Sequence, residues 1–363
     1  MSEDIHWLAE SGQIRLLRDA LAAGAAPDSR DDDGRTALHV AAERGRTDVV
    51  TALLDAGADV EAAAERAPRP RALHLACARE HRDLVTALVQ RGADVTARTD
   101  RGESPLHLVV PWCDAELVDE LIARGADSGA ADSSGRTPLH AAAVRGARLP
   151  VDALLEDLDG TDPPARERTA RQRLEDDHVM TALLEAGAAV DAADEGGVTP
   201  LLLAAKGGAE RAVQMLLDQG ARADVADAYG ITPLHRAATA DVAQRLLEAG
   251  AGPGLPDRDG RTPLHRAVGS GRSEVADLLL DRGAPVDAAD QEGRTALHVA
   301  AAAGRAHAIE TLIDRGADPN ARDRDGRTPR WAAEAAGHSL AAQTLRRRGG
   351  KCRPKRFLFF DLQ

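Results

Sequence analysis

A four-residue segment recurs along this chain at a nearly constant spacing. Copies of Thr-Pro-Leu-His, or of a close variant, begin at Thr36, Arg71, Ser104, Thr137, Thr199, Thr232, Thr262, Thr295 and Thr328. Their successive spacings are 35, 33, 33, 62, 33, 30, 33 and 33 residues. A fixed period of this length is typical of repeat proteins, in which each unit packs only on its neighbours. The chain is therefore expected to fold as a stack of small units.

Each copy carries the signals for two helices and a turn. A Thr or Ser followed by Pro favours a helix start, because the hydroxyl caps the helix and Pro suits its first position. An Ala-rich first helix is expected there, as at 39–45, and apolar residues at helical spacing predict a second helix, as at 49–54. A Gly-Ala pair ends the second helix, and an Asp-x-x-Gly turn follows, as at 290–293.

The composition fits thin helical layers. Hydrophobic residues make up 43% of the 363 residues, but aromatic residues only 2%. One thick globular core would draw on many more aromatic side chains, because each of them buries a large area. Small Ala, Leu and Val side chains suffice for layers one helix pair thick.

The tetrad, its period, the Gly-Ala stop and the turn together resemble the ankyrin repeat. The resemblance covers roughly residues 3–349. It implies an all-α ankyrin-repeat solenoid of about ten repeats, each a turn or β-hairpin followed by helix-turn-helix. We expect an N-terminal capping repeat at 1–30, repeats at 31–146, an insertion or degenerate repeat at 147–191, repeats at 192–327, a C-terminal capping repeat at 328–349 and a basic-aromatic tail at 350–363.

The spacing of 62 residues marks the largest irregularity. Residues 147–158 can serve as the second helix of the repeat that begins at Thr137, and 159–191 then read as a degenerate repeat with an eroded hairpin. The alternative is a helical insertion that projects from this repeat. Surface segments tolerate added length at small cost, so the insertion need have no function.

Three smaller irregularities have local consequences. Residues 64–72 replace the tight turn, so a looser hairpin is expected there. Pro111 must end or kink the first helix of its repeat early. The 30-residue spacing leaves a short link between helices after Thr239.

The resemblance to ankyrin repeats implies that a partner binds the concave face, made of turn tips and first helices. Arg261, Arg294 and Arg327 form a ladder there that would accept the acidic end of a partner segment, and apolar residues in the middle repeats would accept its apolar centre. The alternative is that the ladder only pairs with neighbouring Asp side chains as surface charge. The expected partner-binding residues are Trp112, Arg136, Val198, Tyr229, Ile231, Arg261, Arg294 and Arg327.

The tail after residue 349 does not follow the repeat. It combines basic residues with all three Phe of the chain, and such a segment can insert into a partner or an anionic surface. The alternative is a loose end or a flap on the last repeat. The tail residues concerned are Arg353, Lys355, Arg356, Phe357, Phe359 and Phe360.

The sequence offers no catalytic or metal-binding motif. Seven His occupy the tetrads, but helices of adjacent repeats lie about 8–10 Å apart, too far for one zinc ion to bind two of them. The resemblance gives these His a structural role, with each ring hydrogen-bonded to the turn. We therefore expect no catalytic residues, no metal and no cofactor.

We interpret the chain as a soluble, cytoplasmic and monomeric scaffold that binds a protein or peptide and is not an enzyme. The net charge of −13 disfavours nucleic acid as a partner, except through the tail, and no membrane span is expected. The alternatives are an enzyme or small-molecule binder with a pocket near Trp112 and 147–178, and an adaptor that uses the tail.

Overall fold

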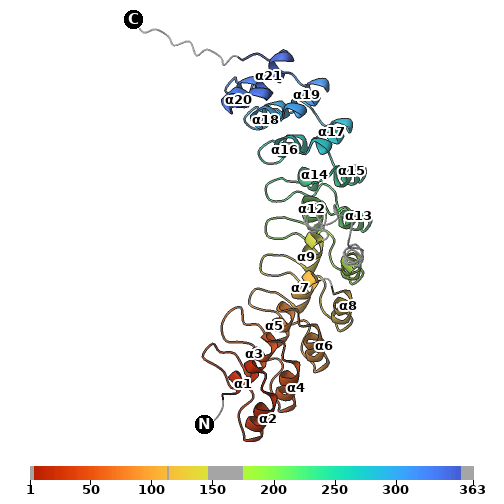
Figure 1. The fold of residues 1–363 in the computed structure, drawn as a ribbon. Helices are drawn as coiled ribbons and strands as arrows, with labels where there is room; N and C mark the ends of the chain where they lie inside the picture. Colours follow the sequence, from red (N-terminus) through yellow and green to blue (C-terminus); the bar gives the residue numbers. More distant parts are fainter. Residues whose placement is uncertain (1–3, 113, 146–174, 353–363) are drawn as a thin grey trace, which may run out of the picture. The chain divides into compact units, whose positions relative to one another are not determined.

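The computed structural model describes residues 4–112, 114–145 and 175–352. Within these ranges the chain forms short helices, and extended pairing is limited to isolated β-bridges. The described residues fall into two compact units, divided between Glu195 and Gly196. Each unit is a stack of helix pairs, which confirms the all-α repeat fold (Figure 1).

In the first unit, the first helices of successive repeats pack on one another, and so do the second helices (Figure 1). The first helices are α1 (Ile5–Ser11), α3 (Ala37–Glu43), α5 (Ala72–Ala78), α7 (Pro105–Val109) and α9 (Pro138–Arg145). The second helices are α2 (Ile14–Ala22), α4 (Thr47–Asp55), α6 (Arg82–Gln90), α8 (Ala115–Ala123) and a helix over 175–185.

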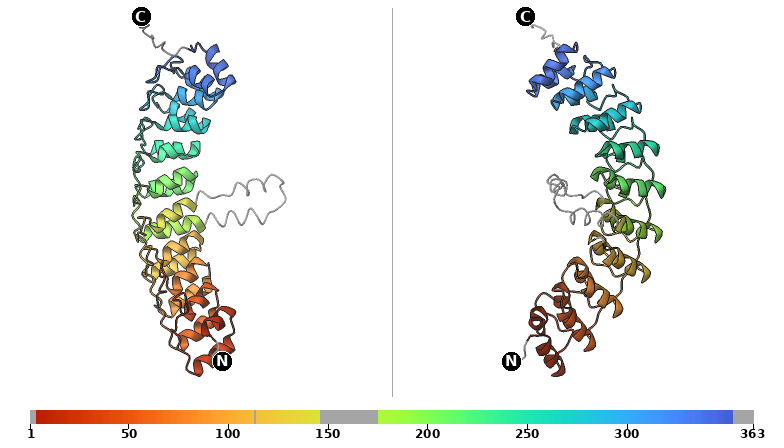
Figure 2. Two further views of the ribbon diagram at one scale, coloured as in Figure 1. Left: turned by 90° about the vertical axis from the view of Figure 1, so that its left-hand side faces the viewer. Right: turned by 45° about the vertical axis from the view of Figure 1, so that its right-hand side comes forward.

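The second unit repeats this arrangement, with the two helices of each repeat side by side and the turns at one edge (Figure 2). Its first helices are α12 (Pro200–Gly207), α14 (Pro233–Arg236), α16 (Pro263–Ser270), α18 (Ala296–Ala302) and α20 (Pro329–Ala335). Its second helices are α13 (Glu210–Asp218), α15 (Ala240–Glu248), α17 (Ser273–Asp281), α19 (Ala306–Asp314) and α21 (Ser339–Arg347).

The tetrad His joins the start of one helix to the following turn. At α16, the Thr262 backbone N–H donates to His265 Nδ1 at 3.1 Å. Since Nδ1 accepts, Nε2 carries the proton and donates to the Arg294 carbonyl at 3.0 Å. His39, His74, His107, His235 and His298 make the equivalent bond to a carbonyl of the next turn. The structural role expected for these tetrad His is confirmed.

Backbone hydrogen bonds also run directly from turn to turn in the second unit. Arg258 N–H donates to the Tyr229 carbonyl at 2.9 Å, and Gln291 N–H donates to the Asp259 carbonyl at 2.8 Å. This close approach requires glycine at Gly260, where φ is +79° and an added Cβ would lie 2.9 Å from Gln291 N. The turn edge of each repeat is thereby tied to its neighbour.

The fifth repeat, in the first unit, shows the same kind of backbone hydrogen bond between turns. Glu195 N–H donates to the Ser134 carbonyl at 2.9 Å, so the turn that contains Glu195 stacks directly on the turn before α9. The helix over 175–185 therefore occupies the place of the second helix of this repeat, the place expected for 147–158. Residues 147–158 themselves lie outside the described residues.

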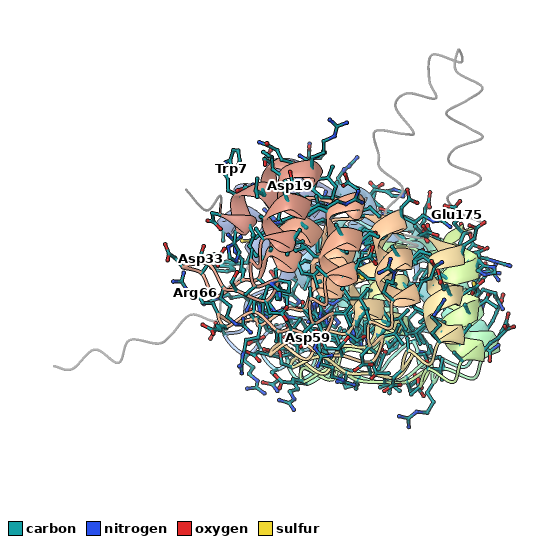
Figure 3. The ribbon with its side chains drawn as sticks, turned by 90° about the horizontal axis from the view of Figure 1, so that it is seen from below. Trp7, Asp19, Asp33, Asp59, Arg66 and Glu175 are labelled. Carbon is teal, nitrogen blue, oxygen red and sulfur yellow. The ribbon has the colours of Figure 1, made fainter. Side chains whose placement is uncertain are left out.

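Each of the three smaller irregularities has a local counterpart in the structure. Helix α7 ends at Val109 and continues as a 3-10 turn over Val110–Trp112, as Pro111 requires. Helix α14 has only four residues, and Thr239 caps α15. The link between α14 and α15, residues 237–239, is as long as the link 44–46 between α3 and α4, so the expectation of a short link is wrong and the missing residues shorten the helix instead. In the altered hairpin, Arg66 forms an ion pair with Asp33 of the preceding turn (Figure 3).

The core of both stacks is built from small side chains, mainly buried Leu, Val and Ala. Among the described residues, no helix is long and apolar enough to cross a bilayer.

Candidate partner-binding groove

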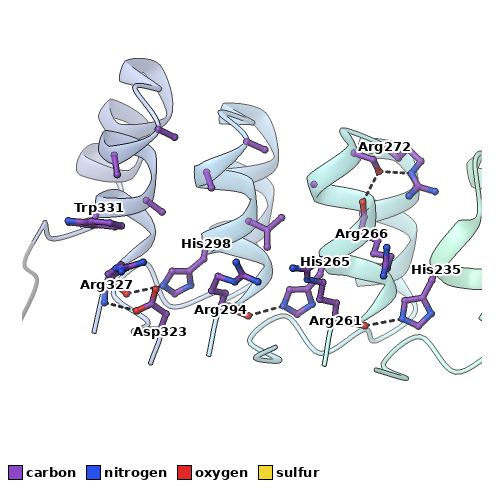
Figure 4. Close-up of a pocket in the computed structure, with 18 of the residues that line it drawn as sticks. His235, Arg261, His265, Arg266, Arg272, Arg294, His298, Asp323, Arg327 and Trp331 are labelled. Carbon is purple, nitrogen blue, oxygen red and sulfur yellow. Dashed lines mark hydrogen bonds between the residues drawn. The ribbon is translucent and has the colours of Figure 1, made fainter. Parts of the chain in front are cut away.

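A groove of about 820 Å³ opens on the first helices of the second unit, from α14 to α20. Its floor is made of small apolar residues near the ends of α18 and α20, and its walls carry arginines (Figure 4). The charged residues that line it are Arg236, Arg261, Arg266, Arg272, Arg294, Arg327 and Asp323. Six guanidinium groups thus face one carboxylate among the lining residues.

The ladder arginines follow one another along this groove, each at the exit of a turn (Figure 4). Each one has an acidic partner. Arg261 lies 3.8 Å from carboxylate oxygens of Asp259 and Asp290. Arg294 lies 2.9 Å from Asp290 and 2.6 Å from Glu292, and Arg327 lies 2.8 Å from Asp325. The alternative expected from the sequence, pairing of the ladder with nearby acidic side chains, therefore does occur.

These pairs leave part of each guanidinium free. Asp290 is buried behind the ladder, and its side chain has 0% exposure, whereas the Arg294 side chain has 36%. Burial alone would raise the pKa of Asp290, but hydrogen bonds from Arg294 hold it below its usual value. The carboxylate is therefore ionised and orients the guanidinium, whose remaining N–H groups are available to a ligand.

Trp331 provides an aromatic surface at the C-terminal end of the groove. The Arg327 guanidinium carbon lies 4.6 Å from the centre of the Trp331 ring, a cation–π contact (Figure 4). The contact fixes an arginine and an aromatic side chain together, and both residue types are common anchors in protein interfaces.

Arg266 and Arg272 lie at the other end of the groove (Figure 4). Arg266 donates from Nε and Nη2 to Asp257 Oδ2, at 3.0 and 2.6 Å. Arg272 donates to Ser270 Oγ at 2.7 Å and to the Ala237 carbonyl. Within the described residues, Arg272 has no carboxylate partner.

Arg236 lines the same end of the groove and also lacks an ion pair within the described residues. Its Nε is buried and has no hydrogen-bond partner, and no other buried side-chain nitrogen or oxygen in the described part of the chain is in that state. Burial lowers the pKa of Arg272, and repulsion from Arg236 and Arg266 lowers it further. This end of the groove thus has an excess of positive charge.

Three tetrad His line the groove, but their chemistry is that of structural residues. Burial lowers the pKa of His235, His265 and His298 below the usual value, because desolvation disfavours the imidazolium form. In the part of the chain that the structure describes, no group of three or more His, Cys, Asp or Glu is placed to hold a metal ion.

The family described as "Ankyrin repeats (3 copies)" matches the chain at residues 5–99, 73–167, 169–253, 238–323 and 282–353. These overlapping matches extend over nearly the whole sequence. The chain belongs to the ankyrin-repeat family. No curated protein matches it. Ankyrin repeats are in general protein-interaction modules, which gives this array its broad functional class.

The ankyrin array brings only some of the expected site residues together. Arg261, Arg294 and Arg327 line the groove, whereas Trp112 and Arg136 lie in the other unit. Tyr229 is 69% exposed on its turn and Val198 is half-buried, and neither lines the groove. The tail residues 353–363 lie outside the described residues.

Ile231 is expected from the sequence to bind a partner, but its placement does not suit that role. Its side chain is only 4% exposed, so it contributes to the core of the array and is not accessible to a partner. It stands one residue before the tetrad, where five of the other repeats carry arginine. An apolar side chain at this place folds inward, whereas arginine reaches the solvent.

Proposed function

We propose that this ankyrin array is a scaffold that binds an acidic segment of a protein partner in the groove of its second unit. The observation that carries the proposal is the charge of the lining, with six arginines and one aspartate. The whole chain has a net charge of −13, so the groove is a local positive site on an acidic protein. Such a contrast attracts and orients an acidic ligand.

The arginines are held ready for a ligand. Asp257 and Asp290, with side chains 1% and 0% exposed, fix Arg266 and Arg294 from behind. Arginine presents five N–H donors in a rigid fork, and a carboxylate of the partner can accept from the ones that remain. Little side-chain entropy is then lost on binding, which favours affinity.

The floor of the groove suits an apolar residue between the acidic ones. Val299, Ala302, Ala303, Ala332 and Ala336 line it, and the Trp331 ring adjoins them. Since these side chains are small, they leave room for a larger partner residue such as leucine. The proposal therefore specifies a segment with an apolar residue flanked by acidic residues.

We also propose two residues outside the groove as partner contacts, each within its own unit. Tyr229 exposes an aromatic ring on its turn, and Trp112 is half-buried at the end of the 3-10 turn in the first unit. Aromatic side chains of this kind commonly anchor partners. A Trp112→Ala or Tyr229→Ala variant that binds as the wild type does would restrict the site to the groove.

The experiment is a titration of a fluorescein-labelled peptide of alternating glutamate and leucine, followed by fluorescence anisotropy. Arg294→Ala and Arg327→Ala should each weaken binding roughly tenfold, about 1.4 kcal/mol, because each removes a charge-assisted contact. Arg315→Ala is the matched control, since Arg315 is similarly exposed and pairs with Asp281 outside the groove. Equal losses in all three variants, or none, would contradict the proposal.

A further inference from the structure

Three arginines from adjacent repeats meet at the end of the groove farthest from Trp331. Arg236 ends α14, Arg266 lies in α16, and Arg272 follows α16 at the start of the next helix. Within the described residues, Asp257 is the one carboxylate paired with any of them, through Arg266. The cluster therefore has about two positive charges that no described residue neutralises through an ion pair.

The cluster lacks a partner for a buried donor. Arg236 Nε is shielded from solvent and has no acceptor among the residues that the structure describes. A buried polar hydrogen without an acceptor is costly, and a bound anion is one of the groups that can satisfy it. Arg236 lines the groove, so an anion that enters from the groove can reach its guanidinium.

Arg272 is held in place by neutral groups. Its Nη1 donates to the Ala237 carbonyl, and its Nε donates to Ser270 Oγ at 2.7 Å. These contacts fix the guanidinium beside two other cations without supplying negative charge. Burial lowers the pKa of Arg272, and repulsion from the nearby Arg236 and Arg266 lowers it further. The direction of this shift agrees with an excess of positive charge in the cluster.

We propose that Arg236, Arg266 and Arg272 form a phosphate-binding subsite that accepts a phosphorylated side chain of the partner segment. This inference rests on the proposed function, since the phosphate is carried by the same acidic segment. A phosphomonoester has a charge of about −1.5 to −2 and three strong acceptor oxygens. It can therefore neutralise the cluster and supply acceptors to several guanidinium groups, whereas one carboxylate supplies a single charge and two oxygens.

A phosphoprotein fits this subsite better than a nucleic acid does. Each phosphodiester of a nucleic acid has a single charge, and its repeated phosphates require an extended basic surface. Here the three arginines of the cluster lie together in one groove, on a chain of net charge −13. The subsite is thus matched to one dianionic group on an otherwise acidic peptide.

The test compares labelled glutamate–leucine peptides that contain one serine with the same peptides carrying phosphoserine, with the serine moved along the sequence in steps. The full chain is titrated with each peptide by anisotropy. At one serine position, phosphorylation should tighten binding by roughly tenfold or more, as expected for added charge-assisted hydrogen bonds. This gain should disappear in Arg236→Gln and Arg272→Gln and persist in Arg315→Gln.

The outcomes separate this inference from the proposed function. If the unphosphorylated peptide binds through the ladder but phosphorylation brings no gain at any position, the phosphate subsite is wrong and the groove proposal stands. If neither peptide binds, both are wrong. A gain that persists in Arg236→Gln and Arg272→Gln would also overturn the subsite. Because Arg272 supports the Ala237 carbonyl, Arg272→Lys serves as a second variant that keeps the charge and a donor, and it should retain part of the gain.

Discussion

The guanidinium of Arg266 and the buried carboxylate of Asp257 form an ion pair, with Nε and Nη2 at 3.0 and 2.6 Å from the same oxygen. The other oxygen of Asp257 accepts the backbone N–H groups of Asp259 and Arg261, both at 2.9 Å. One buried carboxylate thus closes a turn and orients a groove arginine. The fold and the candidate site therefore depend on the same side chain.

Asp257→Asn should destabilise the array strongly, because it removes the charge that compensates a partly buried Arg266. Breaking a buried pair in this way costs about 3–5 kcal/mol, and we expect the lower end because the Arg266 side chain is 25% exposed. Urea unfolding, monitored by circular dichroism, measures the free energy of unfolding of this variant and of the wild type. Asp259→Asn is the control, since its side chain is 62% exposed, and it should change stability by less than about 0.5 kcal/mol. Similar losses in both variants would contradict the role of Asp257.

His265→Ala should also lower the free energy of unfolding. The variant leaves the Thr262 N–H and the Arg294 carbonyl without their partner, and each lost bond to a buried group costs about 1–3 kcal/mol. His307→Ala is the matched control, because His307 is exposed on α19. Equal stability of the His265 variant and the wild type in urea would show that the ring does not support the turn.

The stability of the array should fall as pH decreases from 7 to 5. Burial lowers the pKa of six tetrad His in the folded state, and that of His74 falls from 6.5 to about 4. The unfolded chain then binds more protons in this pH window, so stability is present above about pH 6.5 and is lost as the pH falls toward the folded values. For His74 alone the loss by pH 5 is about 2 kcal/mol.

Urea midpoints at pH 7 and pH 5 check this expectation, with the carboxylates still ionised at both values. A His74→Gln variant should show a smaller difference between the two midpoints, because one titrating group is gone. A midpoint that is unchanged or higher at pH 5 would contradict the account of neutral, buried tetrad His.

Arg236→Met should stabilise the array and weaken phosphopeptide binding at the same time. Methionine has an apolar side chain of similar length, so the substitution removes the unsatisfied Nε and relieves repulsion on Arg272. We expect a gain of about 1 kcal/mol in thermal or urea unfolding, larger at low salt. A loss of stability would show that Arg236 is structurally required and not held for a ligand.

The sequence predicts the repeat fold well because the signals are local and repeated. The Thr cap, the following Pro, and the Gly after each second helix act within a few residues, so each helix start and end is encoded in its own repeat. The fifth repeat is different. Residues 147–158 have a suitable apolar pattern, but the turn that bonds to Ser134 is the distant one at Glu195, a long-range contact that no local pattern encodes.

The sequence predicts only part of the groove, because some of its residues are placed by contacts between repeats. The ladder could be read from the residue before each tetrad, whereas the position of Arg272 depends on contact with a neighbouring repeat. The short α14 leaves the Ala237 carbonyl within reach of Arg272, and the sequence signals this only through the 30-residue spacing. The burial of Ile231, which is only 4% exposed, is likewise seen only in the folded array.

Trp331 offers the most direct measurement of whether the acidic segment binds in this groove. The chain has three Trp, so replacing Trp7 and Trp112 by Phe leaves Trp331 as the sole tryptophan emitter. Titration with the unlabelled glutamate–leucine peptide should then change the Trp331 emission in a saturable way, with a midpoint that matches the anisotropy titration and shifts in Arg327→Ala. Saturable binding by anisotropy with no change in Trp331 emission, and an unshifted midpoint in Arg327→Ala, would contradict binding in the groove.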